Sequence, residues 1–144
     1  MKGENYMHLE FPSRSSNEAF ARSAVAAFAA QLDPTLDELG DIKTAVSEAV
    51  TNAIVHGYRD ALGEVQLHMT ITDDRVFRAE IKDKGCGIAD VEEALQPLFT
   101  TDPEGERSGM GFTIMESFMT TLEISSQPGK GTTVHMRRKL QRRK

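Results

Sequence analysis

The sequence predicts a two-layer α/β sandwich, in which helices cover one face of a mainly antiparallel sheet. Two long segments carry apolar residues at helical spacing, and each begins with a capping-box pattern. Several short segments alternate apolar and polar residues, and turn-forming residues join them in pairs, as in antiparallel hairpins. No repeat or linker interrupts the 144 residues, so we expect a single domain over residues 1–144.

A strand and a helix are predicted at the start of the chain. Residues 7–11 alternate apolar and polar side chains, and the proline that follows ends this strand. Ser15 and Glu18 match a capping box that opens the first helix, and the Asp33-Pro34 pair ends it. The expected buried stripe of this helix comprises Ala21, Val25, Phe28 and Leu32.

The second predicted helix is longer and spans residues 36–55. Thr35 and Glu38 match its capping box, and Gly57 offers a C-terminal stop. Its apolar residues recur at helical spacing and comprise Leu39, Ile42, Val46, Ala49, Val50, Ala53 and Ile54.

Two strands are predicted next, at residues 65–71 and 77–81, with Asp73-Asp74 as the turn between them. Residues 90–93 match the start of a short helix. Residues 97–109 hold prolines, glycines and charges without periodicity, which predicts a long loop of the kind that is usually functional or mobile.

A helix and a hairpin complete the predicted fold. The helix covers residues 111–119, and its inward side chains are expected to be Phe112, Met115, Phe118 and Met119. The hairpin pairs residues 122–126 with residues 132–136 across a Pro-Gly-Lys-Gly turn. The basic run at residues 137–144 is predicted to be a solvated tail, with contact to an acidic partner as the alternative.

Composition and charge describe an ordinary globular protein. Hydrophobic residues make up 39% of the chain and charged residues 27%, and the net charge of −5 gives no nucleic-acid footprint. Cys86 is the single cysteine, which excludes an intramolecular disulfide and a cysteine-based metal site. No apolar stretch is long enough to span a bilayer and no signal peptide is found, so we expect a reduced, cytoplasmic protein.

Two polar residues of the second helix are candidates for chemistry. Glu48 and Asn52 lie four residues apart, so their side chains are neighbours on one face of the helix. An amide oxygen can hold a divalent cation and leave the carboxylate free to act as a base. The alternative, which this segment alone favours, is a polar flank with a hydrogen-bonded pair.

The second candidate segment is Asp83-Lys84-Gly85-Cys86-Gly87. Strand alternation places Asp83 on the inward face, where a carboxylate is costly to bury unless a donor, such as the exocyclic amine of a base, hydrogen-bonds to it. Gly85 and Gly87 would let the backbone turn sharply and lie against a flat ligand. The alternative is that Asp83 simply begins a glycine-rich turn.

The third candidate segment, Arg107-Ser108-Gly109-Met110-Gly111, ends the long loop and opens a helix. Glycines at a helix N-terminus expose backbone N–H groups, and the helix dipole favours an anion there. Arg107 would add a charge-assisted contact to phosphate oxygens. The alternative is a flexible linker with an incidental cap. Neither a dinucleotide-binding motif nor a P-loop is present in the sequence.

The order and spacing of these three segments resemble the GHKL ATPase and kinase superfamily. Within it, four longer strings resemble the anti-sigma F factor family of endospore-forming bacteria, and the similarity runs from about residue 7 to residue 134. The strings are Leu32–Thr35, Val46–Ile54, Gln96–Thr101 and Glu106–Glu116.

The resemblance implies a fold and a role for single residues. The fold would be a Bergerat-type sandwich that binds ATP between the long helix and the lid loop. Asn52 would coordinate Mg²⁺, Glu48 would act as general base, and Asp83 would read adenine. The other nucleotide contacts would be Gly85 and Gly87 in the base pocket, and Arg107, Ser108, Gly109 and Gly111 at the phosphates.

The resemblance also implies partners. The family works as a homodimer that sequesters the sporulation sigma factor F and, with ATP, phosphorylates a serine of an anti-anti-sigma protein, leaving ADP. Arg22 matches a position where the family meets its protein partners. Lys84 stands where relatives commonly carry an acidic residue, so the charge near the base pocket is expected to differ.

Three other functions fit parts of the pattern. A gyrase-type or chaperone-type ATPase module would need large further domains, and a histidine kinase would need a preceding helical hairpin with a phosphoacceptor histidine; we expect neither in this chain. A sigma-sequestering module that binds ATP without transferring phosphate needs no general base, so Glu48 argues against it.

Overall fold

The structure, a computed structural model, describes residues 4–57, 62–87 and 111–141. Within these ranges the strands are β1 (Glu4–Pro12), β2 (Glu64–Thr72), β3 (Val76–Asp83), β4 (Thr121–Gln127) and β5 (Gly131–Lys139). The helices are α1 (Ser16–Ala29), the short 3-10 helix η1 (Ala30–Leu32), α2 (Leu36–Asn52), the π-helical turn η2 (Ala53–Gly57) and α4 (Gly111–Phe118).

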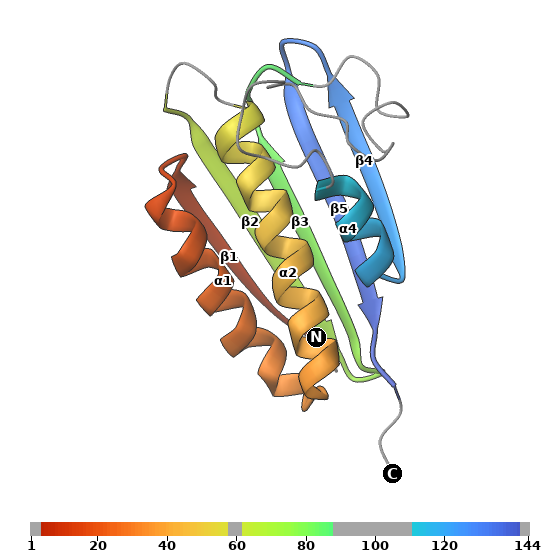
Figure 1. Cartoon of the computed structure of the whole chain (residues 1–144). Helices are drawn as coiled ribbons and strands as arrows, with labels where there is room; N and C mark the ends of the chain where they lie inside the picture. The colour runs from red at the N-terminus through yellow and green to blue at the C-terminus, as the bar shows by residue number, and fades with distance from the viewer. Residues whose placement is uncertain (1–3, 58–61, 88–110, 142–144) are drawn as a thin grey trace.

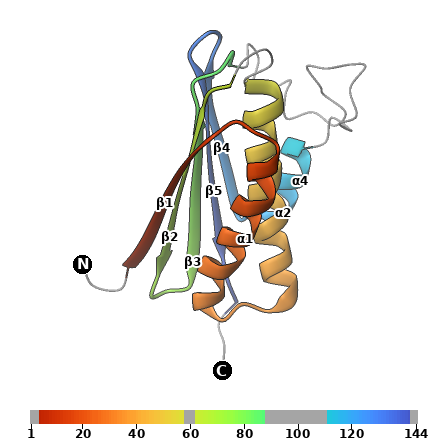
Figure 2. The same cartoon turned by 90° about the vertical axis from the view of Figure 1, so that its left-hand side faces the viewer.

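The described strands form one sheet in the order β1-β2-β3-β5-β4, and every neighbouring pair is antiparallel. Helices α1, α2 and α4 lie side by side on one face of this sheet, and none of the described helices covers the other face (Figures 1 and 2). This arrangement confirms the predicted two-layer sandwich with a mainly antiparallel sheet.

The core lies between the helices and the sheet. Alternate side chains of β2 and β3 face it as predicted, and the buried ones are Val65, Leu67, Met69, Ile71, Phe77, Ala79 and Ile81. Helix α2 is the centre of the helical layer, because it contacts both α1 and α4. In the described ranges, no helix combines the length and the apolar character needed to cross a membrane.

The two predicted capping boxes have different outcomes. At α2 the box is confirmed, since Thr35 Oγ1 accepts the N–H of Glu38 and Glu38 Oε1 accepts the N–H of Thr35. At α1 the prediction is wrong, because Ser15 has helical backbone angles and makes no side-chain cap. A capping side chain needs an extended backbone at that position. The carboxylate of Glu18 accepts instead from the hydroxyl of Ser47 on α2.

The last helix and hairpin follow the prediction closely. Helix α4 covers Gly111–Phe118, and Phe112 and Met115 are buried as expected. In the hairpin, Leu122 lies opposite Met136, which is the register expected from the turn.

Residues 137–141 of the basic C-terminal run differ from the prediction of a solvated tail, and residues 142–144 lie outside the described residues. Strand β5 continues to Lys139, so its inward alternation passes from Met136 to Arg138. Arg138 donates to Asp41 Oδ2 on α2 at 2.7 Å, and the next inward residue, Leu140, is 3% exposed. The guanidinium of Arg138 donates to the carboxylate of Asp41 and to the carbonyl of Phe118, so its charge is paired on the core side of the sheet. With this charge paired, the strand extends past residue 136, where the sequence predicted its end.

Glu38 connects the start of α2 to the end of the described chain. Its side chain is buried, with Oε1 accepting the N–H of Thr35 at 2.9 Å and Oε2 accepting the N–H of Gln141 at 2.8 Å. Burial raises the pKa of Glu38, but the hydrogen bonds from Gln141 and Thr35 and the charge of Arg138 outweigh it, so the pKa lies below its ordinary value. The ionised carboxylate therefore stabilises the fold.

Glu38→Gln should lower the free energy of unfolding by about 2 kcal/mol at neutral pH, because the amide nitrogen would leave one N–H donor without an acceptor. A folded pKa below the unfolded one keeps this stabilisation complete above the ordinary glutamate pKa of about 4.3, and it is lost as the pH falls through the folded pKa. Chemical denaturation over a pH series should show the gap between variant and wild type closing in acid. The control is Asp37→Asn, an exposed carboxylate in the same helical turn, which should cost less than about 1 kcal/mol. Equal losses in both variants would contradict the role of Glu38.

Candidate functional site

Segments from four parts of the chain meet at one end of the sandwich. The end of α2 with η2, the end of β3 and the start of α4 lie toward the upper end of the molecule in Figure 1, and Figure 2 shows the same grouping. Turn η2 contacts β3, and α2 contacts α4. The turn between β4 and β5 joins this end, since the N–H of Gly129 donates to the carbonyl of Cys86 at 2.7 Å.

Glu48 and Asn52 occupy the last turns of α2 at the border of the core. Both are partly exposed, whereas Ala49 and Val50 between them are buried. The amide nitrogen of Asn52 is buried and has no hydrogen-bond partner in the part of the chain that the structure describes. An unpaired buried polar group costs about 1–3 kcal/mol, so a ligand that satisfied this amide would bind favourably. A flip of the amide would present its oxygen at the same point.

The helix changes its winding directly after Asn52. Ala53–Gly57 form the π-helical turn η2, and such turns are frequent at functional sites. Ala53 and Ile54 are buried, so this turn stays packed on the core. The turn ends at Gly57, the stop that the sequence predicted.

Asp83 ends β3 with its side chain on the core face, as predicted, and is 7% exposed. Its carboxylate accepts the N–H of Gly85 at 2.9 Å and the backbone N–H of Thr132. Burial raises the pKa of Asp83, and these two hydrogen bonds offset only part of that effect. Both partners are neutral backbone donors, and no described cation pairs with the carboxylate. A ligand N–H would therefore find a strong acceptor here.

The loop after Asp83 packs tightly against the β4–β5 turn. Gly87 has a φ of +75°, and a Cβ on it would lie 2.0 Å from the carbonyl oxygen of Gln127. Gly131 has a φ of +95°, and a Cβ on it would lie 2.1 Å from the carbonyl oxygen of Asp83. The sequence suggested a flat ligand as the reason for Gly87. The structure adds a second reason, which is the close approach of two backbone segments.

Two residues of this end were predicted only as parts of a hairpin. Gly131 permits the close approach to Asp83, and Thr132, opposite Asp83 in the β3–β5 register, donates to its carboxylate. The Thr132 hydroxyl lies 2.8 Å from that of Ser126, which helps to hold the strand end. The signal in the sequence was the second glycine of the Pro-Gly-Lys-Gly turn, since glycine permits both a positive φ and a close backbone approach.

The remaining predicted site residues are placed differently. Gly111 is the first residue of α4, so the N-terminus of that helix lies at this end of the molecule. Arg22 lies on the exposed side of α1, where it pairs with a glutamate of the same helix and does not join the site. The predicted phosphate contacts that lie outside the described residues are Arg107, Ser108 and Gly109.

This set of groups suits a cation that arrives with a ligand. Among the described residues, no three His, Cys, Asp or Glu side chains are arranged to hold a metal ion. Mg²⁺ prefers oxygen ligands, and it usually takes one or two from the protein and the others from phosphates and water. The unpaired atom of Asn52 is its amide nitrogen, so the amide oxygen would fit one such ligand once the amide is flipped. Glu48, on the same helical face, supplies a carboxylate that can accept a proton.

Several known proteins are similar to this chain. The histidine kinase-like ATPase domain family matches residues 11–138. The anti-sigma F factor of Bacillus subtilis (strain 168) is 58% identical over 142 residues, which cover 98% of this chain and 97% of that protein. The anti-sigma F factor of Caldanaerobacter subterraneus subsp. tengcongensis is 57% identical over 136 residues, which cover 94% of each chain.

Among solved structures, the RsbU and RsbW domains of a Mycobacterium tuberculosis protein share the fold. Their crystal structure superposes with a TM-score of 0.70 at 20% sequence identity, and the match covers 96% of this chain and 33% of that one. At this identity the similarity concerns the fold alone.

Gly131→Ala should lower the free energy of unfolding by about 3 kcal/mol or more, because the methyl group would overlap the Asp83 carbonyl and the left-handed backbone would be strained. The matched control is Gly129→Ala in the same turn. Its φ is +76°, yet a Cβ there would meet no described atom within 4 Å, so we expect a loss of only about 1 kcal/mol. Equilibrium denaturation measures both variants. A loss at Gly131 no larger than that at Gly129 would contradict the proposed backbone contact.

Proposed function

Because the chain belongs to the histidine kinase-like ATPase domain family, and to the anti-sigma F factors within it, we propose that it binds ATP and Mg²⁺ where α2, β3 and α4 meet, and that it is a serine kinase. The observation that carries this proposal is the buried amide nitrogen of Asn52, which is unpaired in the described residues and lies one helical turn after Glu48. Asp83 adds a second incompletely compensated group at the same end. Such groups cost stability, and a ligand that pairs with them explains why they are there.

In this proposal the base and the phosphates of ATP are held by different elements. Asp83 accepts a hydrogen bond from the exocyclic amine of adenine, while Gly85 and Gly87 form the floor of the base pocket. The N-terminus of α4 faces the phosphates, because exposed backbone N–H groups and the helix dipole favour an anion. The residues assigned to the phosphates are Arg107, Ser108, Gly109 and Gly111.

The phosphoryl transfer requires a base and a metal ligand on one helical face. Mg·ATP, when bound, supplies the phosphoryl group and the positive charge that offsets the negative charge of the transferring phosphate. Asn52 holds the metal through its amide oxygen. Glu48 accepts the proton of a serine hydroxyl as that hydroxyl attacks the γ-phosphoryl group, so the products are ADP and phosphoserine. The buried side of α2 keeps both side chains in place.

We further propose that the substrate serine belongs to an anti-anti-sigma protein and that the chain, as a homodimer, sequesters the sporulation sigma factor F. The support is the high identity, over nearly the whole chain, to proteins named anti-sigma F factor. Arg22 is assigned to a protein contact, because it is exposed on α1 and arginine is a common interface anchor.

The direct experiment combines the purified protein with Mg²⁺, labelled ATP and a candidate anti-anti-sigma protein. Label on a serine of that protein is the expected result. If the protein binds ATP and sigma factor but transfers no phosphate, it is a sequestering module, and the kinase proposal is overturned.

Asp83→Asn should weaken ATP binding by about 1 kcal/mol or more, because a charged acceptor forms a stronger hydrogen bond than a neutral one. Titration calorimetry measures the change directly. Asp73→Asn, at an exposed position of the β2–β3 turn, serves as the control and should bind ATP like the wild type. Unchanged ATP affinity in Asp83→Asn would remove Asp83 from the proposed base pocket.

Glu48→Gln should retain Mg·ATP and sigma-factor binding but lose serine phosphorylation by about two orders of magnitude, because it keeps size and removes the proton acceptor. Asn52→Ala should lose phosphorylation and Mg²⁺-dependent ATP binding together. Single-turnover transfer assays and calorimetry separate the two results. The control is Glu123→Gln on the open face of the sheet, which should transfer at the wild-type rate. A near wild-type rate in Glu48→Gln would show that Glu48 is structural.

A further inference from the structure

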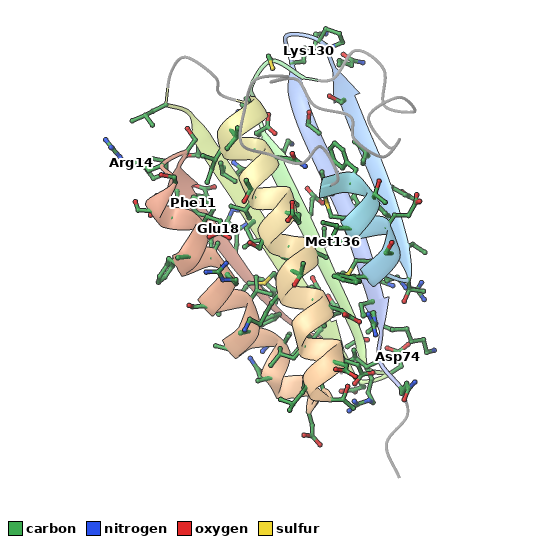
Figure 3. The ribbon with its side chains drawn as sticks, in the orientation of Figure 1. Phe11, Arg14, Glu18, Asp74, Lys130 and Met136 are labelled. Atoms are coloured by element: carbon green, nitrogen blue, oxygen red, sulfur yellow. The ribbon has the colours of Figure 1, made fainter. Side chains whose placement is uncertain are left out.

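The carboxylate of Glu18 bridges α1 and α2, and Figure 3 shows this residue at the boundary between the two helices. Its Oε1 atom accepts a hydrogen bond from the hydroxyl of Ser47 on α2. The same Oε1 atom accepts from Nη1 of Arg22, one turn further along α1, at 3.2 Å. A single oxygen is therefore shared by donors from two helices.

The two donors differ in their exposure to solvent. The side chain of Arg22 is 47% exposed and that of Glu18 is 21% exposed. A guanidinium group carries five N–H donors, and in the described residues Arg22 uses them only toward Glu18. Arg22 therefore has donors left on its solvent side. A carboxylate of a bound protein would compete with Glu18 for the charge of Arg22 and would leave Oε1 more fully to Ser47.

Ser47 directly precedes Glu48 in α2. The other side chains of this turn that face the core are Val46, Ala49 and Val50, all buried and apolar. The apolar stripe sets which side of the helix faces the core, but apolar packing is non-directional and resists small rotations about the axis only weakly. The hydroxyl–carboxylate bond is directional and selects one rotation. A small rotation would move the Glu48 carboxylate away from the hydrogen-bond distance of about 2.6–3.2 Å that a general base needs.

We propose that Glu18 is a positioning residue for phosphoryl transfer. Through Ser47 it holds the turn of α2 that carries Glu48, and through Arg22 it connects this turn to the surface of α1 where a protein partner binds. This rests on the proposed function, because the reaction and the partner are those proposed above. A purely structural role is the alternative, since a carboxylate in the first turn of α1 is favoured by the helix dipole alone.

A double-mutant cycle on Glu18 and Ser47 tests the positioning role. Ser47→Ala and Glu18→Ala should each lower the single-turnover transfer rate at saturating ATP and substrate protein by at least about fivefold, with ATP affinity within about twofold of wild type. The double variant should be no slower than the slower single variant, because both changes remove the same bond. Ser47→Thr keeps the hydroxyl and should recover most of the rate. The control is Ser125→Ala on the open face of the sheet, expected at the wild-type rate.

Amide hydrogen exchange gives a readout that does not depend on catalysis. In Ser47→Ala and Glu18→Ala, the amides of residues 48–52 should exchange at least about threefold faster than in wild type, whereas those of residues 39–45 in the same helix should not change. Arg22→Gln leaves Oε1 more fully to Ser47, so it should not speed exchange at residues 48–52.

The possible outcomes separate this inference from the kinase proposal. If the wild type transfers phosphate and Ser47→Ala transfers it at the same rate, the positioning role is overturned. Independent, multiplicative losses in the double variant overturn it as well. Faster exchange along all of α2 would indicate general destabilisation and would likewise overturn it. If the wild type transfers no phosphate, the kinase proposal fails and a positioning role in transfer is overturned with it, whereas wild-type transfer with unchanged variant rates overturns the positioning role alone.

Discussion

A carboxylate buried at the end of β3 is costly, and the backbone around it is arranged to reduce that cost. Asp83 accepts N–H groups from Gly85 and Thr132, and the second of these is in reach only because β5 pairs with β3 in the observed register. The same register brings Gly131 so close to Asp83 that no side chain fits between the two segments. The β3–β5 register thus supplies a donor to the buried carboxylate and, through the close backbone approach, requires glycine at position 131.

The two ends of helix α2 differ in how fully their polar side chains are paired. At its N-terminal end, Glu38 holds the cap of the helix and Gln141, two residues after β5, and Asp41 pairs with Arg138. These polar contacts are satisfied and stabilise the fold. At its C-terminal end, the amide of Asn52 lacks a partner in the described residues. An unpaired buried group lowers the stability of the free protein, and a ligand that pairs with this group binds more tightly as a result.

Much of the architecture could be predicted from the sequence because burial imposes a period on the chain. An apolar stripe recurs about every 3.6 residues in a helix and every 2 residues in a strand, so α2, β2 and β3 were recognisable from local pattern alone. The inward position of Asp83 followed from the same alternation. The turn length of the last hairpin predicted that Leu122 lies opposite Met136, since turn geometry and register are linked.

Only the tertiary structure decided the partners of polar side chains. The patterns at Ser15 and Thr35 are the same, yet the first fails as a capping box: Ser15 has helical backbone angles, and Glu18 accepts from the hydroxyl of Ser47 on a neighbouring helix. Likewise Arg138 lies in strand β5, opposite Phe77 of β3, and the carboxylate of Asp41 on α2 pairs with its charge there. Hydrogen bonds and ion pairs between segments distant in sequence depend on distances that exist only after the helices pack on the sheet, so no local pattern contains them.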